Sequence, residues 1–240
     1  MVLSNNTVNF YELNGTSDKK TRLTKEIALA YDPKPISDKK REVEVAAASR
    51  STAFSRAYDM MGVQWTYKSA NRTPNNSVTT APAHLDYAPS SSGDTKNGIP
   101  YNWGGMNGVD TGTSGTYINF TSGISNGKYA GNISSTVTSS AVGVDCSGFV
   151  SAAYNFGTKY GTSTLNQVFT NTTWSSLVQG DIANKSGFHV WILDKFSKNS
   201  NGEIMSVSTY EATTDGTEDK AKSWARTWTD AQTYTPMTLK

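Results

Sequence analysis

The sequence predicts an α+β domain in which a short helix packs on an antiparallel sheet. Apolar side chains recur over residues 146–156 at the spacing i, i+3, i+4, i+7, i+8, which is typical of the buried face of a helix. Residues 188–196 and 204–212 are rich in β-branched and aromatic side chains and are joined by a short polar loop, which indicates two hairpin strands. Hydrophobic residues make up 36% of the 240 and charged residues 18%, so the chain can bury a core and is not generally disordered.

The composition argues against several kinds of partner and site. A net charge of +2 is weak for a nucleic-acid binder, and the apolar stretch 189–193 is far shorter than the ~18 residues of a membrane helix. One cysteine cannot form an internal disulfide, and with two histidines it argues against a zinc site. We expect no nucleic acid, membrane span, metal ion or cofactor, and we expect a monomer. The side chains left for nucleophilic or acid–base work near neutral pH are Cys146, His84 and His189.

The first 42 residues differ from the rest of the chain. Residues 1–42 hold 14 of the 42 formal charges and contain one or two segments of strand character, followed by a charged, proline-containing stretch that is typical of a linker. We treat them as an unassigned N-terminal extension. The domain itself is expected over residues 43–240, and it begins with a helix at 43–61 that Gly62 ends.

Residues 64–144, between this helix and the next one, are mostly loop. Residues 87–180 are rich in Gly, Ser, Thr and Asn, and recurring aromatic side chains indicate packed loops with a short helix near 117–124. Asp145 is a good N-cap for the helix that follows, and Gly157 is a good terminator for it. A last strand is expected at about 233–239.

Cys146 stands in the first turn of the predicted helix. The helix dipole and the unpaired N–H groups of this turn lower the pKa of a thiol and can receive an oxyanion during acyl transfer. The alternative is a small buried hydrophobe, which is what many lone cysteines are. His189 begins a predicted strand and is a better base for the thiol than His84, which lies in a loop.

A base needs a partner that orients it, and the hairpin offers one. If the loop is centred on Ser200, His189 faces Glu211 directly, with Cβ atoms ~4.5–5.5 Å apart. The competing arrangement is a two-residue turn at residues 201–202, which places His189 opposite Thr214.

At this point the residues resemble those of a known family. Residues 143–150 (GVDCSGFV) resemble the nucleophile motif of the NlpC-type (p-sixty) cell-wall hydrolases, which are papain-like cysteine peptidases. Residues 100–105 (PYNWGG) resemble the family's Tyr-x-Trp-Gly-Gly segment. Residues 180–182 (GDI) and 188–192 (FHVWI) resemble its Gly-Asp-hydrophobic turn and its histidine strand. The three motifs occur in the family's order, and the resemblance spans about residues 100–212.

The resemblance implies a papain-like (NlpC-type) fold and a cysteine peptidase mechanism. Cys146 would be the nucleophile, His189 the base and Glu211 the third polar residue, with no metal or cofactor. The positions that would bind substrate are Tyr101, Trp103, Asp145 and Ser147. The implied activity is hydrolysis of an amide bond in the stem peptides of bacterial peptidoglycan. The alternatives are a muramoyl-alanine amidase, an amide acyltransferase on the same fold, or a non-catalytic wall-binding module.

Two features depart from the family pattern. Between Gly105 and Asp145 lie 39 residues, many more than the family has there, so residues 106–144 form an insertion. Because both of its ends join cleft motifs, we expect it to form one wall or a lid of the cleft; the alternative is a surface excursion. The third position is most often His in the family, and here it is Glu211.

The expected location is outside the cell. The first residues show no basic segment followed by an apolar one, so a signal peptide is not visible. Low-charge loops rich in Asn, Ser and Thr, without a disulfide, suit an exported bacterial protein. We therefore expect a secreted or cell-wall-associated protein whose signal peptide has been removed.

Overall fold

The computed structural model describes residues 2–4, 7–9, 38–85, 93–109 and 118–240, with the backbone alone for residues 2–4, 7–9 and 38–48. The chain divides into two compact units, Met1–Glu44 and Val45–Lys240, and each is described by itself. In the first unit, strands β1 (Val2–Ser4) and β2 (Thr7–Asn9) pair antiparallel. Most of the predicted extension lies outside the described residues.

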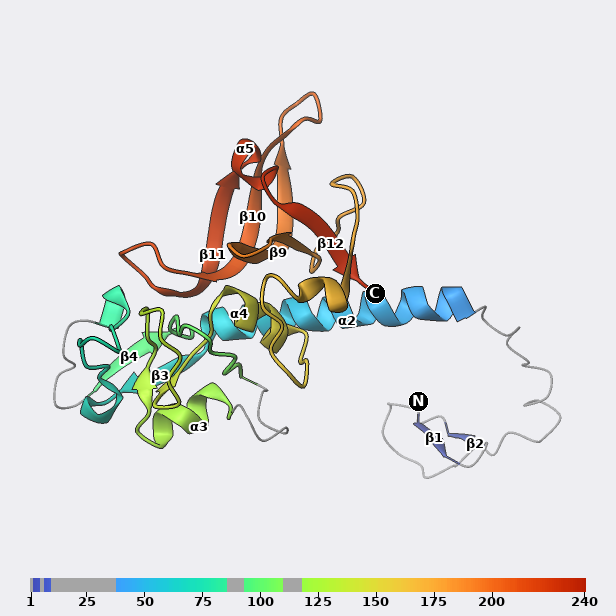
Figure 1. The fold of residues 1–240 in the computed structure, drawn as a ribbon. Coiled ribbons are helices and arrows are strands. Elements are labelled where there is room, and N and C mark those ends of the chain that lie inside the picture. Colours follow the sequence, from blue (N-terminus) through green and yellow to red (C-terminus); the bar gives the residue numbers. More distant parts are fainter. Residues whose placement is uncertain (1, 5–6, 10–37, 86–92, 110–117) are drawn as a thin grey trace, which may run out of the picture. The chain divides into compact units, whose positions relative to one another are not determined.

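Helices and antiparallel strands make up the second unit, as the sequence predicts (Figure 1). Its helices and 3-10 turns are α2 (Asp38–Gly62, which begins within the predicted linker), η1 (Ser69–Asn71), η2 (Ala83–Leu85), α3 (Phe120–Ser125), α4 (Cys146–Ala153), η3 (Leu165–Gln167) and α5 (Trp228–Ala231). Its strands are β3 (Gln64–Tyr67), β4 (Asp94–Asn97), β5 (Tyr129–Ala130), β6 (Ala141–Val142), β7 (Phe169–Asn171), β8 (Ile182–Lys185), β9 (His189–Lys198), β10 (Ile204–Thr213), β11 (Lys220–Thr227) and β12 (Thr235–Leu239).

Six of these strands form one antiparallel sheet with the order β11-β10-β9-β8-β12-β7. Helix α4 packs against β9 and β10, and α5 packs against β10 and β11 (Figure 1). Side chains of β9 alternate between two cores: Ile192 joins the larger one, with Phe149 of α4, and Trp191 joins the smaller one, with Tyr234. Both faces of β9 are therefore covered over residues 190–193, which explains why these four residues are continuously apolar instead of alternating.

Helix α4 begins where the sequence predicts and ends earlier. Its last helical residue is Ala153, and Asn155 adopts a left-handed conformation with φ of 53°. The N–H of Phe156 then donates to the carbonyl of Ser151 at 3.0 Å, which closes the helix end. The left-handed residue that ends the helix is thus Asn155 and not the predicted Gly157.

The loop between β9 and β10 matches neither predicted turn. The N–H of Asn199 donates to the carbonyl of Glu203 at 2.9 Å, and the N–H of Gly202 donates to the carbonyl of Asn199 at 3.0 Å. Gly202 takes a φ of 84°, which glycine adopts without steric cost. The loop is therefore centred on Asn201, one residue beyond Ser200, and it is longer than a two-residue turn.

A β-bulge interrupts the same hairpin. Ser208 pairs with Lys195, but the next residue, Thr209, pairs with Leu193, so Asp194 is an extra residue on β9. The Asp194 carboxylate accepts a hydrogen bond from the Ser208 hydroxyl at 2.9 Å, which fastens the bulge.

The bulge cancels an earlier register shift between Ile204 and Ser206, so Glu211 keeps the register that the loop sets. Beyond it Tyr210 pairs with Ile192, so the register continues with Glu211 opposite Trp191, diagonal to His189 on one face. Direct pairing of His189 with Glu211 is therefore wrong, and so is pairing with Thr214. Without the extra residue, Glu211 would lie opposite Ile192 and point to the other face, because a slip of one residue turns every side chain over.

The insertion at 106–144 is folded where it is described. Its helix α3 covers Phe120–Ser125, close to the predicted 117–124, and Asn119 caps it by accepting from the N–H of Ser122. Phe120 is fully buried and contacts Trp65 edge-on, with ring centroids 5.4 Å apart. Strands β5 and β6 pair parallel. The insertion thus contributes to the larger core.

Candidate active site

Cys146 is the first residue of helix α4 and is buried. Asp145 caps the helix, as predicted: its Oδ1 accepts the N–H of Gly148 at 2.7 Å and the hydroxyl of Ser147 at 3.0 Å. The N–H groups of the first helical turn have no acceptor within the helix. The thiol therefore lies beside backbone donors that can receive a developing negative charge.

The second carboxylate oxygen of Asp145 ties the helix to the motif at 100–105. Oδ2 accepts the N–H of Gly104 at 2.9 Å and the ammonium of Lys159 at 2.7 Å. Because both of its carboxylate oxygens accept hydrogen bonds, Asp145 joins the start of helix α4 to Gly104 and Lys159. Its predicted contact with substrate requires that one of these four partners be displaced.

Glycines bring the two motifs into direct backbone contact. A Cβ atom on Gly148 would lie 1.8 Å from the carbonyl oxygen of Gly105, and a Cβ on Gly105 would lie 2.4 Å from the carbonyl oxygen of Gly143. Any larger residue at these positions would separate the segments. The glycines therefore let the segment that carries Trp103 pack against the start of helix α4.

His189 begins β9, and its Nε2 lies 2.5 Å from Oε2 of Glu211. Burial lowers the pKa of His189, but hydrogen bonds and charge interactions with Cys146 and Glu211 outweigh burial and raise it to about 9. Glu211 holds Nε2, so Nδ1 is the ring nitrogen left to exchange a proton with Cys146. The structure thus brings Cys146, His189 and Glu211 together.

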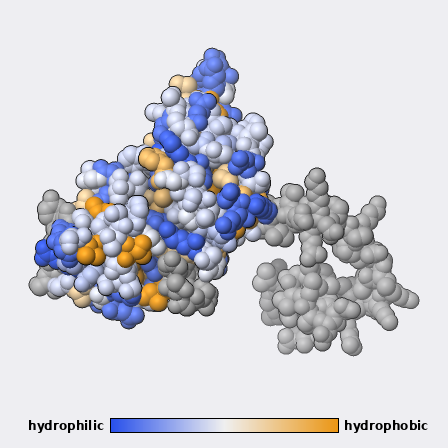
Figure 2. All heavy atoms as spheres, viewed as in Figure 1, coloured by the Kyte–Doolittle hydropathy of each residue, from blue (hydrophilic) through white to orange (hydrophobic). Residues whose placement is uncertain are grey.

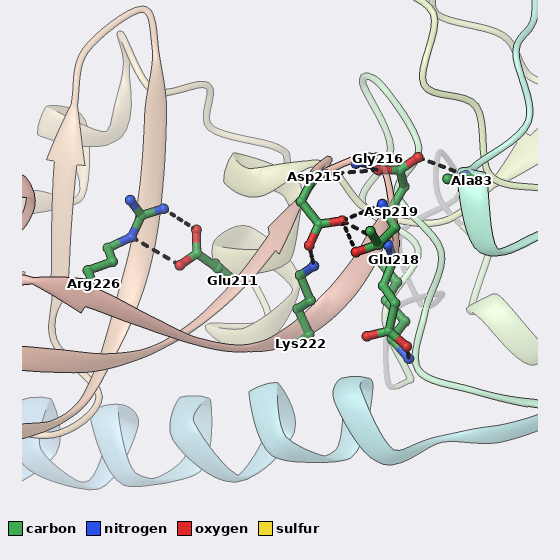
Figure 3. A network of polar contacts seen from close by, with 10 residues as sticks. Ala83, Glu211, Asp215, Gly216, Glu218, Asp219, Lys222 and Arg226 are labelled. Carbon is green, nitrogen blue, oxygen red and sulfur yellow. Dashed lines mark hydrogen bonds and ion pairs between the residues drawn. The ribbon is translucent and has the colours of Figure 1, made fainter.

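Glu211 is fully buried, and its carboxylate is surrounded by donors. Oε1 accepts the hydroxyl of Thr209 at 2.6 Å and Nε of Arg226 at 3.1 Å, while Oε2 accepts Nη2 of Arg226 at 2.5 Å in addition to His189. Figure 3 shows the Arg226 guanidinium facing this carboxylate. Burial raises the pKa of Glu211, but His189 and Arg226 together outweigh burial and lower it to about 2.

The sequence reasoning missed Arg226 and Tyr234. The Tyr234 ring packs edge-on against His189 with centroids 6.3 Å apart, and the Arg226 guanidinium carbon lies 5.2 Å from the same ring centroid. The alternation of Lys222, Trp224 and Arg226 on the strand after Glu211 was a signal for side chains on one face. No motif marks Tyr234.

Neighbouring Lys222 does not join the Glu211 cluster. It pairs with Asp215, as Figure 3 shows, although it stands directly opposite Glu211 in the β10–β11 register. The loop that follows Asp215 is held by hydrogen bonds between its own residues. Oδ2 of Asp219 also accepts the N–H of Ala83 at 2.7 Å. The carbonyl of Asp219 accepts the N–H of Tyr101 at 2.8 Å, so this loop supports the segment beside the thiol.

The remaining predicted site residues differ in their exposure. Tyr101 is buried, and burial together with the negative charges of Cys146 and Asp145 raises the pKa of its phenol. Trp103 is 42% exposed and can meet a ligand. Ser147 is buried and donates its hydroxyl to Asp145. Tyr101 therefore lies close to Cys146, and Ser147 bonds the carboxylate that caps the helix.

Part of the insertion runs beside the motif at 100–105. The N–H of Trp103 donates to the carbonyl of Asn132 at 2.8 Å, and the N–H of Asn132 donates to the carbonyl of Tyr101 at 2.9 Å. A Cβ on Gly104 would lie 2.6 Å from the side chain of Val137, which is itself exposed. The described part of the insertion thus borders the predicted cleft.

His84 lies in a different environment. Burial first, then the charge of Lys220, lowers its pKa to about 4. Both ring nitrogens are buried without a hydrogen-bond partner among the described residues. The charged neighbours of His84 include Asp219 and Lys220, whereas the histidine that interacts with the thiol is His189.

A pocket of about 500 Å³ lies away from the thiol, and its lining residues are Ser69, Arg72, Thr73, Pro74, Asn75, Ala81 and Leu85. None of the predicted site residues lines it. On the face in Figure 2, apolar residues form small groups among hydrophilic ones. No group of three or more His, Cys, Asp or Glu side chains that could hold a metal ion occurs in the part of the chain that the structure describes.

Comparisons of the chain with protein-family models, with curated proteins and with solved structures find no match. Within residues 38–85, 93–109 and 118–240, no helix is both long enough and apolar enough to cross a membrane.

Proposed function

We propose that this protein is a cysteine-dependent hydrolase that cleaves an amide bond in the stem peptides of bacterial peptidoglycan, on a papain-like domain of the NlpC type. The observation that carries the chemistry is the chain of contacts from Cys146 through His189 to the buried Glu211. The substrate class is supported by the resemblance of the three ordered motifs to the NlpC-type hydrolases.

The reaction starts from a thiolate–imidazolium pair, in which the proton of Cys146 resides on Nδ1 of His189. The thiolate attacks the carbonyl carbon of the amide, a C–S bond forms, and the carbonyl oxygen becomes an oxyanion. The backbone N–H groups of Cys146 and Ser147 open helix α4 without an intrahelical acceptor and are the donors that stabilise it.

The intermediate then collapses and the C–N bond breaks. His189 gives the proton on Nδ1 to the departing nitrogen, so the amine leaves neutral and an acyl-enzyme remains. Water attacks the thioester carbonyl, His189 takes one water proton, and breakage of the C–S bond releases the acid and restores the thiolate beside the imidazolium. Glu211 keeps the imidazole ring in the orientation that both steps need.

Digestion of purified peptidoglycan tests this proposal. The wild-type protein should release fragments with new peptide termini, identified by mass spectrometry, whereas Cys146→Ala and His189→Ala should release none. His84→Gln is the matched histidine control and should digest like the wild type. Release of the same fragments by a folded Cys146→Ala variant would contradict the proposal.

The same digest separates the related activities. Hydrolysis between two amino acids identifies an endopeptidase, and separation of the peptide from the muramoyl group identifies an amidase. A new amide in place of a free acid, formed when an amine is added, identifies acyl transfer. Binding without any fragment would identify a wall-binding module.

A further inference from the structure

We propose that Arg226 is a positioning residue, which shares the Glu211 carboxylate with His189 and thereby sets the pH range over which the Cys146–His189 pair is charged. The inference rests on the proposed function only in taking Cys146 and His189 as the reacting pair. It concerns a residue on β11 that belongs to none of the three motifs.

The first support is the geometry around the carboxylate. Arg226 binds both oxygens of Glu211 with a fork of two donors, at 3.1 Å and 2.5 Å, and the second oxygen also receives His189 at 2.5 Å. Thr209 fills the remaining position on the first oxygen. Each oxygen therefore accepts two hydrogen bonds, and the carboxylate cannot rotate without losing several of them.

The second support is that Arg226 is itself held in place. Its Nη1 donates to Asp230 at 2.7 Å, and its guanidinium carbon lies 5.2 Å from the Tyr234 ring centroid. Asp230 belongs to α5, and Tyr234 also packs against His189. Asp230 of α5 and Tyr234 thus hold the guanidinium of Arg226 in the orientation in which it contacts Glu211.

The third support is the charge balance of a buried site. A buried carboxylate whose only charged partner is an imidazolium would hold the imidazolium proton strongly, because little solvent screens the two charges. Arg226 places a second positive charge on the same carboxylate, so Glu211 stays ionised while its attraction for the His189 proton is shared. This sharing explains how a carboxylate, instead of a neutral polar side chain, can be the partner that orients His189.

Several charged or titratable groups surround the imidazole. They are Cys146 on α4, Glu211 on β10, Arg226 on β11, Asp230 on α5, Lys185 on β8 and Tyr234 ahead of β12. Lys185 pairs with His189 in the β8–β9 register, and its ammonium lies 5.9 Å from the Tyr234 ring centroid. Arg226 differs from Lys185 because it bonds the atom that bonds His189.

The test is the rate at which iodoacetamide alkylates Cys146, measured as a function of pH. A charged thiolate–imidazolium pair gives two steps, and the upper step, when His189 loses its proton, is expected near pH 9. In Arg226→Met the upper step should move up by about one pH unit, because a positive charge that repels the imidazolium is gone. Arg226→Lys keeps the charge and should shift less.

Two further variants make the test decisive. Asp230→Asn removes an exposed negative charge that partly neutralises Arg226, so the upper step should move down, opposite to Arg226→Met. Lys220→Met removes a cation at the far end of the same strand, paired with Glu218, and should leave the step in place. Thermal melting shows whether each variant is folded. If Arg226→Met does not fold, the direction of the shift in Asp230→Asn tests the role of Arg226.

The outcomes separate this inference from the proposed function. An upper step that stays in place in folded Arg226→Met, or in Asp230→Asn, overturns the role of Arg226 whatever the digestion experiment shows. A two-step profile that shifts as expected, in a protein that digests no peptidoglycan, supports Arg226 and removes the proposed substrate. A single step like that of an ordinary thiol overturns the reacting pair and both proposals.

Discussion

Glu211 shows how much one buried side chain depends on its neighbours. Its carboxylate is fully buried and accepts hydrogen bonds from His189, Arg226 and Thr209. Taking a charge out of water costs several kcal/mol, and that cost is offset only when partners of opposite charge are in place. Removing the carboxylate would therefore leave Arg226 buried with one partner fewer, and it would weaken the fold and the site together.

A pair of variants tests this dependence. Glu211→Gln should lower the free energy of unfolding by about 3 kcal/mol, because Arg226 loses its buried partner, and it should slow catalysis roughly 10²-fold, because the imidazolium is less stable. Glu211→Gln combined with Arg226→Met should recover much of the stability and none of the rate. Urea denaturation measures the first quantity and peptidoglycan digestion the second. Equal stability of wild type and Glu211→Gln would show that the pair contributes little.

At the scale of elements, the helix that carries Cys146 was predictable and the hairpin register was not. The N-cap Asp145 and the apolar spacing after it are local signals, and the structure confirms the start of α4. The register at Glu211 is the one that the loop sets, because the shift between Ile204 and Ser206 and the bulge at Asp194 cancel along the hairpin. The loop is centred on Asn201 instead of Ser200, so the pairing of His189 was predicted wrongly although its contact with Glu211 was predicted.

Arg226 was missed for a related reason. It stands opposite Val207 in the β10–β11 register, and its long side chain reaches along the strand to Glu211. The cation directly opposite Glu211 is Lys222, which turns to Asp215 instead. Register and spacing alone would have selected Lys222, because they do not show which of two cations already has another partner.

The contact between α4 and the motif at 100–105 is an element-scale feature that mutation can test. Gly148→Ala places a methyl group 1.8 Å from the carbonyl oxygen of Gly105, so the helix start must shift, and we expect a loss of about 1–3 kcal/mol with slower alkylation of Cys146. Gly157→Ala is the matched control, because nothing lies within 4 Å of its Cβ position. Unfolding in urea and iodoacetamide rates measure both effects. Equal stability of the two variants would show that this close packing is not required.

At the scale of the whole molecule, the insertion at 106–144 is part of the core. Phe120 and Val142 are buried in it, and Asn132 is fully buried, with Nδ2 donating to the carbonyl of Thr136 and Oδ1 accepting the N–H of Thr80. Removing the whole insertion would therefore take away core side chains as well as the segment that bonds the motif at 100–105. The sequence predicted the position of this segment beside the site, and it could not show how many of its residues the core needs.

The buried charges of the site also make stability of the whole domain depend on pH. The pKa of Glu211 is lowered to about 2, so its stabilisation is present above its ordinary value of 4.5 and is lost as the pH falls through 2. The pKa of His189 is raised to about 9, so its stabilisation is present below its ordinary value of 6.5 and is lost as the pH rises through 9. Burial raises the pKa of Asp181, so this carboxyl acts in the opposite direction to Glu211.

Burial lowers the pKa of His84 to about 4, so His84 already reduces stability as the pH falls below its ordinary value of 6.5. We therefore expect the melting temperature to be highest near pH 6.5 and to fall on both sides. The alkaline decline should be absent in His189→Asn, because the group whose proton is lost is gone, while the acid decline should persist there in weaker form. Differential scanning calorimetry across pH 2–10 in one buffer series measures both limbs. A wild-type melting temperature that stays level from pH 6.5 to pH 9, or an alkaline decline that persists unchanged in His189→Asn, would show that the His189–Glu211 pair does not control the stability of the domain.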